Sequence, residues 1–315
     1  MKPFIVVSDG FDKNQFAALC DVAEFEIYPE RKISQDTLRE LLPKINGLII
    51  RSATTMNQEL IDQAPNLKLI IRAGEGTDNI DKTYCAERGI KVANTPGANN
   101  NSAAEHAIAL MMTVLRKTAW ANKSMSEGKW EKALFAGNEL ANKKVGIVGF
   151  GRIGQIVAKR LAGFDPEVLF FDPFIEKSQL PYANKAKDLA EIFETCEIIT
   201  LHTPLMDATK GMVNRSLLES MREDAILVNA SRGGIVDEEA LYDILKNKKI
   251  RAAGFDVFAT EPLPADNSLK DLDNLVMTPH LGASTDEAQI RVGAMAVEQM
   301  KEFFINDNLL NEVRG

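Results

Sequence analysis

Short runs of apolar residues, rich in isoleucine and valine, recur along the amino-terminal third of the chain. A stretch with helical spacing of its apolar positions separates each run from the next. Such runs, bounded by turn residues, predict strands, and their alternation with helices favours parallel strands joined by helical crossovers. The expected strands cover residues 4–7, 25–28, 48–51, 67–72 and 90–93.

The rest of the chain repeats this alternation, with strands expected at residues 145–148, 168–171, 198–202, 226–229, 252–256 and 275–278. Six strands separated by helices predict a second doubly wound sheet. The sequence therefore predicts an α/β fold made of two doubly wound, parallel-sheet (Rossmann-like) domains with a cleft between them.

Two longer amphipathic stretches connect these halves. Residues 102–128 predict one long helix, with Ser102 as its N-cap and Glu105 as the capping-box partner. Residues 284–306 predict a final helix that packs back on the first half. We therefore expect a substrate-binding, flavodoxin-like domain of residues 1–97 and 285–315, a dinucleotide-binding Rossmann domain of residues 98–284, and a homodimer formed through the 102–142 region.

Composition narrows the class of protein. The 315 residues are 45% hydrophobic and 26% charged, as expected of a globular protein. Because 45 acidic residues outweigh 37 basic ones, giving a net charge of −8, no nucleic-acid partner is expected. Cys20, Cys85 and Cys196 have no metal-ligand spacing, so we expect reduced thiols, no metal site and a cytoplasmic location. No apolar run approaches the roughly 20 residues that cross a membrane.

The strongest chemical signal is the segment GFGRIG at residues 149–154, which matches the pattern G-x-G-x-x-G. It directly follows the expected strand 144–148 and opens a helix over residues 155–162. In this context the first glycine permits a tight turn, the second lets a pyrophosphate approach the backbone, and the third allows close packing of helix and strand. These glycines are Gly149, Gly151 and Gly154.

Asp172 stands 18 residues after Gly154, at the end of the next expected strand. A carboxylate at this place accepts hydrogen bonds from the ribose hydroxyls of NAD and repels the 2′-phosphate of NADP. The sequence therefore predicts NAD as the cofactor.

The chain has three histidines in which to search for a general acid or base. His106 lies inside the long helix and is interpreted as a packed or surface residue. His202 ends a strand and is expected to order a loop. His280 ends the last strand, so it is expected to line the ligand crevice together with Arg232 and Glu261, which follow two other strands. A base, a guanidinium fork for a carboxylate and an acid that fixes the imidazole are what oxidation of a 2-hydroxy acid needs.

Further segments carry a resemblance to a known family: residues 72–81 (RAGEGTDNID), 94–96 (NTP), 128–131 (GKWE), 148–154 (VGFGRIG), 230–238 (ASRGGIVDE) and 279–285 (PHLGAST). Over nearly its whole length the chain resembles the D-isomer-specific 2-hydroxyacid dehydrogenases. Within that family it is most similar to the phosphoglycerate dehydrogenase branch.

The resemblance implies roles for individual residues. The catalytic trio falls on Arg232, Glu261 and His280. Arg152 and Ile153 contact the pyrophosphate, Thr203 the adenosine side and Asp256 the nicotinamide carboxamide. The rest of the cofactor wall includes Ala230, Ser231, Gly282 and Ala283. The substrate acid is bound by Arg51, Ser52 and Gly74, together with Arg232 and His280. Glu75 stands where these enzymes often have threonine, and the loop 97–101 departs from the family pattern.

The expected activity is NAD-dependent oxidation of 3-phospho-D-glycerate (3-phosphoglycerate) to 3-phosphohydroxypyruvate, the first step of L-serine biosynthesis. A glyoxylate/hydroxypyruvate reductase or another D-2-hydroxyacid dehydrogenase is the alternative. A dinucleotide-sensing corepressor would be a binding protein of another class, but the segment LGAST after His280 lacks the aromatic residues of those proteins. Glu261, where formate dehydrogenases have glutamine, argues against that activity. The serine-binding domain of longer relatives is not expected, so serine should not regulate activity.

Overall fold

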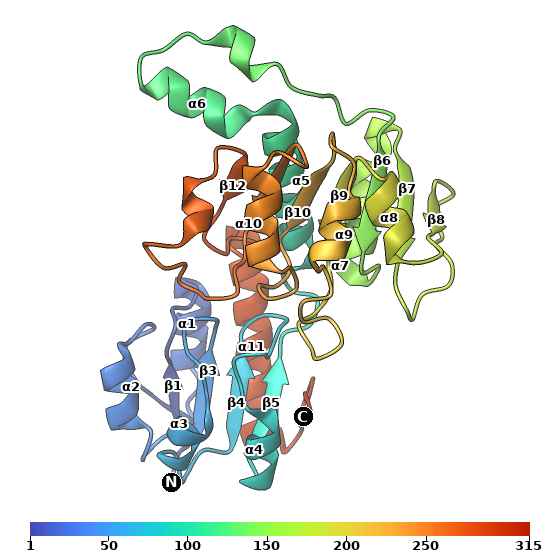
Figure 1. Cartoon of the computed structure of the whole chain (residues 1–315). Helices are drawn as coiled ribbons and strands as arrows, with labels where there is room; N and C mark the ends of the chain where they lie inside the picture. The colour runs from blue at the N-terminus through green and yellow to red at the C-terminus, as the bar shows by residue number, and fades with distance from the viewer. The chain divides into compact units, whose positions relative to one another are not determined.

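The computed structural model describes residues 1–315 and divides into two compact units. One comprises Met1–Asn99 and Ala283–Gly315, and the other comprises Asn100–Gly282. Each unit holds one parallel sheet with helices on both faces (Figure 1). The predicted α/β class with two doubly wound sheets is confirmed. Which unit binds which molecule stays a prediction.

The first unit has five parallel strands in the order β2-β1-β3-β4-β5, which is the flavodoxin-like order. The strands are β1 (Phe4–Val7), β2 (Glu26–Ile27), β3 (Gly47–Ile50), β4 (Leu69–Arg72) and β5 (Lys91–Asn94). One face is covered by α2 (Gln35–Leu41), α3 (Gln58–Asp62) and α4 (Lys82–Glu87). The other is covered by α1 (Lys13–Cys20) and α11 (Asp286–Asn306).

Helix α11 explains why the first unit is discontinuous in sequence. It begins after the N-cap Thr285, whose side-chain oxygen accepts a hydrogen bond from the Ala288 amide. Val292 and Met300, on its buried face, join the same apolar cluster as Leu19 of α1. Burial of this apolar stripe contributes about 25 cal/mol of free energy per Å² of apolar surface and so stabilises the packing of the last helix on the first sheet.

The second unit has seven parallel strands in the order β12-β11-β10-β9-β6-β7-β8. They are β6 (Lys144–Val148), β7 (Glu167–Phe171), β8 (Ala183–Lys185), β9 (Ile198–Leu201), β10 (Ile226–Asn229), β11 (Ala252–Phe255) and β12 (Leu275–Met277). The prediction of six strands is wrong, because β8 pairs with the edge of β7. Its three residues include a single apolar side chain, too short a pattern to predict a strand.

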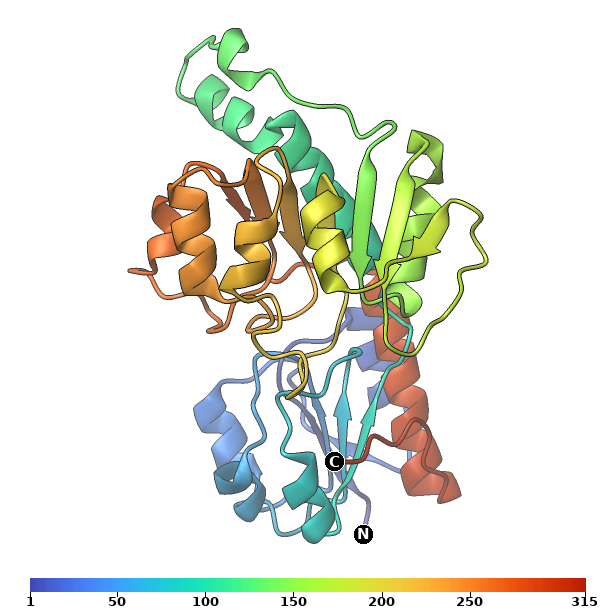
Figure 2. The same cartoon turned by 45° about the vertical axis from the view of Figure 1, so that its right-hand side comes forward.

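Helices cover both faces of this sheet (Figure 2). Helix α5 (Asn100–Arg116) packs with α7 (Arg152–Leu161) on one face. The other face carries α8 (Leu189–Thr195), α9 (Arg215–Ser220) and α10 (Glu238–Lys246). Short 3-10 turns are η1 (Lys132–Phe135), η2 (Ala162–Phe164) and η3 (Ser268–Asp271). No helix in either unit is long and apolar enough to span a membrane.

The predicted single helix over residues 102–128 is wrong. Lys117 adopts a left-handed backbone with a φ of 54° and separates α5 from α6 (Thr118–Ser126). Ser102 is not an N-cap, because α5 begins at Asn100 and the buried Ser102 hydroxyl has no hydrogen-bond partner. Glu105 pairs instead with Arg160, at 3.1 Å. Helix α6 and η1 project from the end of this unit, as the green segment of Figure 1 shows.

Candidate active site

The loop between β6 and α7 lies where the strand order of the larger sheet reverses, since β6 pairs with β7 on one side and β9 on the other. Ligands of open α/β sheets bind at this switch point, beyond the carboxyl ends of the strands. Gly149 has a φ of +88°, and a Cβ added there would lie 2.6 Å from the carbonyl oxygen of His202. Glycine is therefore required at this turn.

The other two glycines of the loop meet different requirements. A Cβ on Gly154 would collide with the carbonyl oxygen of Gly149, so helix and loop pack closely there. A Cβ on Gly151 would meet no atom within 4 Å, so the space beside this residue is open. No side chain caps α7, which starts with Arg152 and Ile153, and an uncapped helix start suits a phosphate group.

Asp172, directly after β7, is tied to the glycine loop by its side chain. The residue is 9% exposed, and its two carboxylate oxygens accept hydrogen bonds from the amides of Phe150 and Phe174, each at 2.8 Å. Each carboxylate oxygen has a second lone pair, so both retain capacity for a hydroxyl donor. The loop thus positions the acid that the sequence assigns to the ribose.

One buried polar atom at this crevice lacks a partner. The hydroxyl of Thr203, beyond β9, has no hydrogen bond. Buried hydroxyls are seldom left unpaired, which makes this atom a candidate ligand contact. The open space beside Gly151, the uncapped helix and the unpaired hydroxyl together fit a bound dinucleotide.

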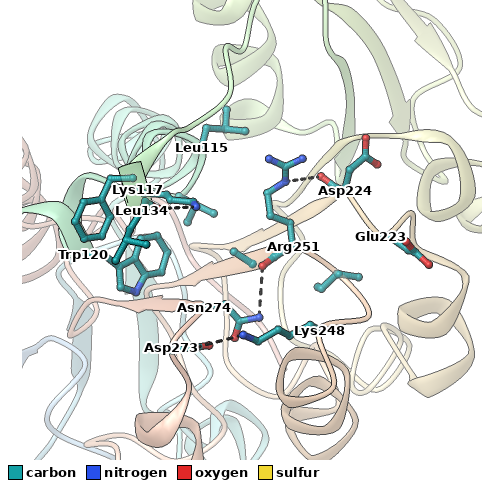
Figure 3. Close-up of a pocket in the computed structure, with 14 residues that line it drawn as sticks. Leu115, Lys117, Trp120, Leu134, Glu223, Asp224, Lys248, Arg251, Asp273 and Asn274 are labelled. Carbon is teal, nitrogen blue, oxygen red and sulfur yellow. Dashed lines mark hydrogen bonds and ion pairs between the residues drawn. The ribbon is translucent and has the colours of Figure 1, made fainter. Parts of the chain in front are cut away.

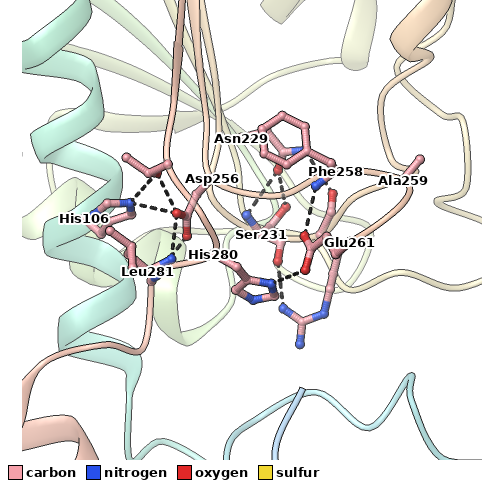
Figure 4. Close-up of polar contacts among 12 residues, drawn as sticks. His106, Asn229, Ser231, Asp256, Phe258, Ala259, Glu261, His280 and Leu281 are labelled. Carbon is pink, nitrogen blue, oxygen red and sulfur yellow. Dashed lines mark hydrogen bonds and ion pairs between the residues drawn. The ribbon is translucent and has the colours of Figure 1, made fainter. Parts of the chain in front are cut away.

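Glu261 and His280 meet beyond the carboxyl ends of β11 and β12 (Figure 4). The Nδ1 atom of His280 lies 2.6 Å from Oε2 of Glu261, and Oε1 of Glu261 accepts the amide of Phe258 at 3.0 Å. Since the carboxylate accepts from Nδ1–H, the Nε2 atom of the neutral ring carries the lone pair. His280 also has a left-handed φ of 55°, which costs roughly 1–2 kcal/mol outside glycine. The surrounding bonds must hold it there.

Arg232 lies in the turn that follows β10, where Asn229 organises the backbone. The Asn229 side chain accepts from the amide of Ser231 at 3.1 Å and donates to the carbonyl of Arg232 at 2.9 Å. A Cβ on Gly233 would collide with the carbonyl of Phe258, so this turn packs directly on the turn that leads to Glu261. The three members of the predicted catalytic trio thus lie on neighbouring turns of one unit.

Asp256 is the most deeply buried acid of this site, with no exposed side-chain surface. Burial by itself would raise the pKa of Asp256, but hydrogen bonds from His106, Thr278 and the Leu281 amide outweigh it and lower the pKa. The imidazole Nε2 of His106 lies 3.1 Å from Oδ1 of Asp256. Sequence reasoning missed this contact, because the two residues are far apart in the chain and only the fold of α5 against β11 joins them.

Most of the other predicted site residues follow strands of the second unit. Ala230 and Ser231 open the turn after β10, and Gly282 closes the second unit. Ala283 belongs to the first unit. His202 bonds Thr200 at 3.0 Å, and burial lowers the pKa of His202 to about 4, so its ring is neutral at pH 7. Thr200 belongs to β9, and a role of His202 in ordering a loop stays a prediction.

In the first unit, the predicted substrate residues also follow strands. Arg51 and Ser52 come after β3, and Gly74 comes after β4. The Arg51 amide donates to Asp9 at 2.7 Å. Burial lowers the pKa of the Arg51 guanidinium, and the Asp9 charge opposes this shift. Glu75 accepts the amide of Gly97 at 2.6 Å, so its carboxylate is used within the first unit's own loops.

A cavity of about 610 Å³ lies at the opposite, amino-terminal ends of β10, β11 and β12 (Figure 3). Its apolar lining includes Trp120 of α6 and Leu134 of η1, together with residues of α5 and of the start of β11. Among its charged lining residues, Lys248 lies 3.6 Å from Asp273, and Arg251 donates to the Asp224 carbonyl at 3.1 Å. None of the predicted site residues lines it.

The strand order and the glycine loop of the second unit are those of the doubly wound folds that bind dinucleotides. Comparison with known proteins gives the family. Residues 108–282 match the domain described as "D-isomer specific 2-hydroxyacid dehydrogenase, NAD binding domain". The chain belongs to this family, and NAD is the cofactor that the domain binds.

Three relatives illustrate the range of the family. The chain is 44% identical over 297 residues to the hydroxypyruvate reductase of Thermotoga maritima, covering 93% of this chain and 96% of that one. It is 44% identical over 276 residues to the D-3-phosphoglycerate dehydrogenase of Archaeoglobus fulgidus, covering 87% of this chain but 52% of that one. The NAD complex of formate dehydrogenase from Staphylococcus aureus has a TM-score of 0.88 at 28% identity, covering 100% of this chain and 99% of that one.

Proposed function

We propose that this chain catalyses the NAD-dependent oxidation of 3-phospho-D-glycerate to 3-phosphohydroxypyruvate, the D-3-phosphoglycerate dehydrogenase reaction of L-serine biosynthesis. The observation that carries a dehydrogenase reaction is the pairing of His280 with Glu261 at 2.6 Å beside a dinucleotide loop. The name of the Archaeoglobus relative supports phosphoglycerate as the acid.

The proposed chemistry assigns one task to each residue. Bound NAD supplies the hydride acceptor for the C2–H bond of the substrate. The Nε2 atom of His280 accepts the C2 hydroxyl proton as the C=O bond forms. Glu261 keeps the ring in the tautomer that makes Nε2 the acceptor and stabilises the imidazolium that results. Arg232 pairs with the substrate carboxylate through its planar fork, which fixes C2 relative to His280.

The same proposal assigns the contacts with the cofactor. Gly149, Gly151 and Gly154, with Arg152 and Ile153, bind the pyrophosphate, and Asp172 binds the ribose. Thr203 lies on the adenosine side, and Asp256 near the carboxamide. The substrate acid also meets Arg51, Ser52 and Gly74 of the first unit, with Arg51 reading the phosphate.

A hydroxypyruvate reductase is the second candidate, favoured by the Thermotoga relative, of which this chain covers 96%. The substrates of the two enzymes differ in the phosphate group. A panel of acids with NAD separates them: 3-phospho-D-glycerate, D-glycerate and D-lactate, with 3-phosphohydroxypyruvate, hydroxypyruvate and glyoxylate for the reverse direction with NADH.

We expect kcat/KM for the phosphorylated acid to exceed that for D-glycerate by about 10- to 100-fold, because each hydrogen bond to a charged group is worth about 1.5–3 kcal/mol. Arg51→Ala should reduce this preference. A higher kcat/KM on hydroxypyruvate than on its phosphate would favour the reductase. Binding of NADH without turnover of any acid would favour a corepressor-like protein.

The proposal includes a cytoplasmic homodimer formed through residues 102–142. Met125, Trp130 and Leu134, on and near α6, are 53%, 81% and 62% exposed, an apolar surface that a second copy could cover. Sedimentation equilibrium tests the dimer, and Trp130→Glu should weaken it. A monomer at micromolar concentration would contradict this part of the proposal.

A further inference from the structure

The turn that carries His280 is organised around the side chain of Asp256. Oδ1 of Asp256 accepts the Thr278 hydroxyl at 2.6 Å and the Leu281 amide at 2.7 Å, and Oδ2 accepts the Gly282 amide at 2.8 Å. The backbone carbonyl of Asp256 also accepts the His280 amide, at 2.8 Å. One buried acid therefore holds the residues on both sides of His280 in the left-handed turn.

His106 completes this arrangement from α5 (Figure 4). Its Nε2 atom lies 3.1 Å from both the Thr278 hydroxyl and Oδ1 of Asp256. Thr278 already donates its only hydroxyl hydrogen to Asp256, and an ionised carboxylate can only accept. Nε2 of His106 must therefore carry the hydrogen and donate to this pair.

We propose that His106 is a positioning residue for His280: its Nε2–H fixes the Asp256 carboxylate, and this carboxylate fixes the turn from Thr278 to Gly282. The inference rests on the proposed role of His280 as the proton acceptor. His106 touches neither the His280 ring nor Glu261, so its effect passes through Asp256. A turn left without this donor would let the His280 ring depart from Glu261.

Two substitutions separate the hydrogen bond from the volume of the ring. His106→Leu removes the hydrogen-bond donor and puts in its place an apolar side chain suited to a helix. His106→Gln keeps an N–H group at about the reach of Nε2. Glu105→Gln is the matched control, because Glu105 is the neighbouring residue of α5 and its ion pair is with Arg160. Thr278→Val removes the shared hydroxyl and tests the same link should His106→Leu not fold.

The direct readout is the imidazole NMR spectrum of the full chain labelled with ¹⁵N-histidine, since three histidines give three sets of signals. In His106→Leu, the downfield Nδ1–H signal of His280 should shift or broaden, and His106→Gln should restore it. In the substrate assay, kcat should fall by about 10- to 100-fold in the leucine variant, because small displacements of a catalytic group have effects of this size. Affinity for NAD should fall less than kcat, because only part of the cofactor site, Asp256 and Gly282, belongs to this turn, and His106→Gln should recover most of kcat.

Unchanged His280 signals in both His106→Leu and Thr278→Val would overturn the inference. So would a loss of NAD affinity with His280 unmoved, because His106 would then act on the cofactor through Asp256. If no acid is oxidised by the wild-type chain, the proposed function fails. The His280 signals still decide whether His106 positions the ring.

Discussion

The two ends of the seven-stranded sheet are built on opposite plans. At the carboxyl ends of β10, β11 and β12, successive turns are bonded to one another. The Asp256 amide donates to the Asn229 carbonyl at 2.9 Å, and the His280 amide donates to the Asp256 carbonyl at 2.8 Å. At the amino ends of the same strands, side chains surround a cavity of about 610 Å³.

The ion pairs at the two ends differ in the same way. His280 and Glu261 are 2.6 Å apart with 29% and 32% of their side chains exposed, whereas Lys248 and Asp273 are 3.6 Å apart with 72% and 76% exposed. Exposed pairs contribute about 0–1 kcal/mol and leave both partners free to move. We therefore place the proposed chemistry at the interlocked turns, which fix the directions of functional groups, and not at the cavity.

The largest difference between the two ends of the sheet should come from truncating one basic side chain at each end, His280 and Lys248. His280→Ala should lower kcat by about 10²- to 10⁴-fold, the usual loss when a general base is removed, with NAD affinity retained. Lys248→Ala should leave kcat and KM unchanged. Steady-state kinetics and a fluorescence titration with NADH measure both effects. A kcat near wild type in His280→Ala would refute its assignment as the proton acceptor.

Substitutions at the two ends of β7 should differ in their effect on cofactor choice. Asp172→Ala should raise the Kd for NAD by about 10- to 100-fold, since it removes a charged hydrogen-bond acceptor. It should also relax the exclusion of NADP. Asp172→Asn, which keeps one oxygen for a backbone amide, should relax the exclusion with a smaller loss of stability. Glu167, at the amino end of β7 and paired with Lys144 at 3.5 Å, supplies the control variant Glu167→Ala.

A wild-type chain that already prefers NADP in the same kinetic assay would remove the proposed role of Asp172. If Asp172→Ala and Glu167→Ala changed the preference for NAD over NADP equally, neither end of the strand would select the cofactor.

The contrast also explains what the sequence could predict. Apolar runs locate nearly every strand, and the glycine spacing locates the dinucleotide loop, since both signals lie within a few consecutive residues. Strand β8 and the left-handed Lys117 have no such local signal. The contact of His106 with Asp256 depends on how α5 packs across β10 and β11, so the residues alone could not reveal it. The proposed trio of Arg232, Glu261 and His280 could be predicted because each follows a strand.

Alanine substitutions of two glycines should show a smaller difference, in the Kd for NADH. Gly151 and Gly163 both have open space where a Cβ would lie, so neither Gly151→Ala nor Gly163→Ala should strain the fold. Gly151→Ala should still raise the Kd for NADH several-fold, because its methyl group would occupy the space proposed for the pyrophosphate. Gly163→Ala, beside the amino end of β7, should leave that Kd unchanged. Isothermal titration measures both, and equal Kd values would place the pyrophosphate elsewhere.

A last contrast distinguishes the two ends of β9 by their response to acid. Burial lowers the pKa of His202, at the carboxyl end, to about 4 from the ordinary histidine value of 6.5. Between these values the unfolded chain binds a proton that the folded chain does not, so stability falls as pH falls, by at most about 1.4 kcal/mol per pH unit. His202→Gln should therefore lose less stability than the wild type over this range.

Glu197 stands at the amino end of β9, and its pKa is also lowered, but for a different reason. Burial would raise its pKa, but hydrogen bonds from Lys143 and the Lys144 amide outweigh this and lower the pKa below 4.5. The stabilisation from Glu197 is present above pH 4.5 and is lost as pH falls through its lowered value, so Glu197→Gln should match the wild-type slope above pH 4.5 and become flatter below it. Urea unfolding at a series of pH values tests both variants. Parallel curves for His202→Gln and the wild type from pH 6.5 to 4.5 would mean that His202 is not buried as a neutral ring.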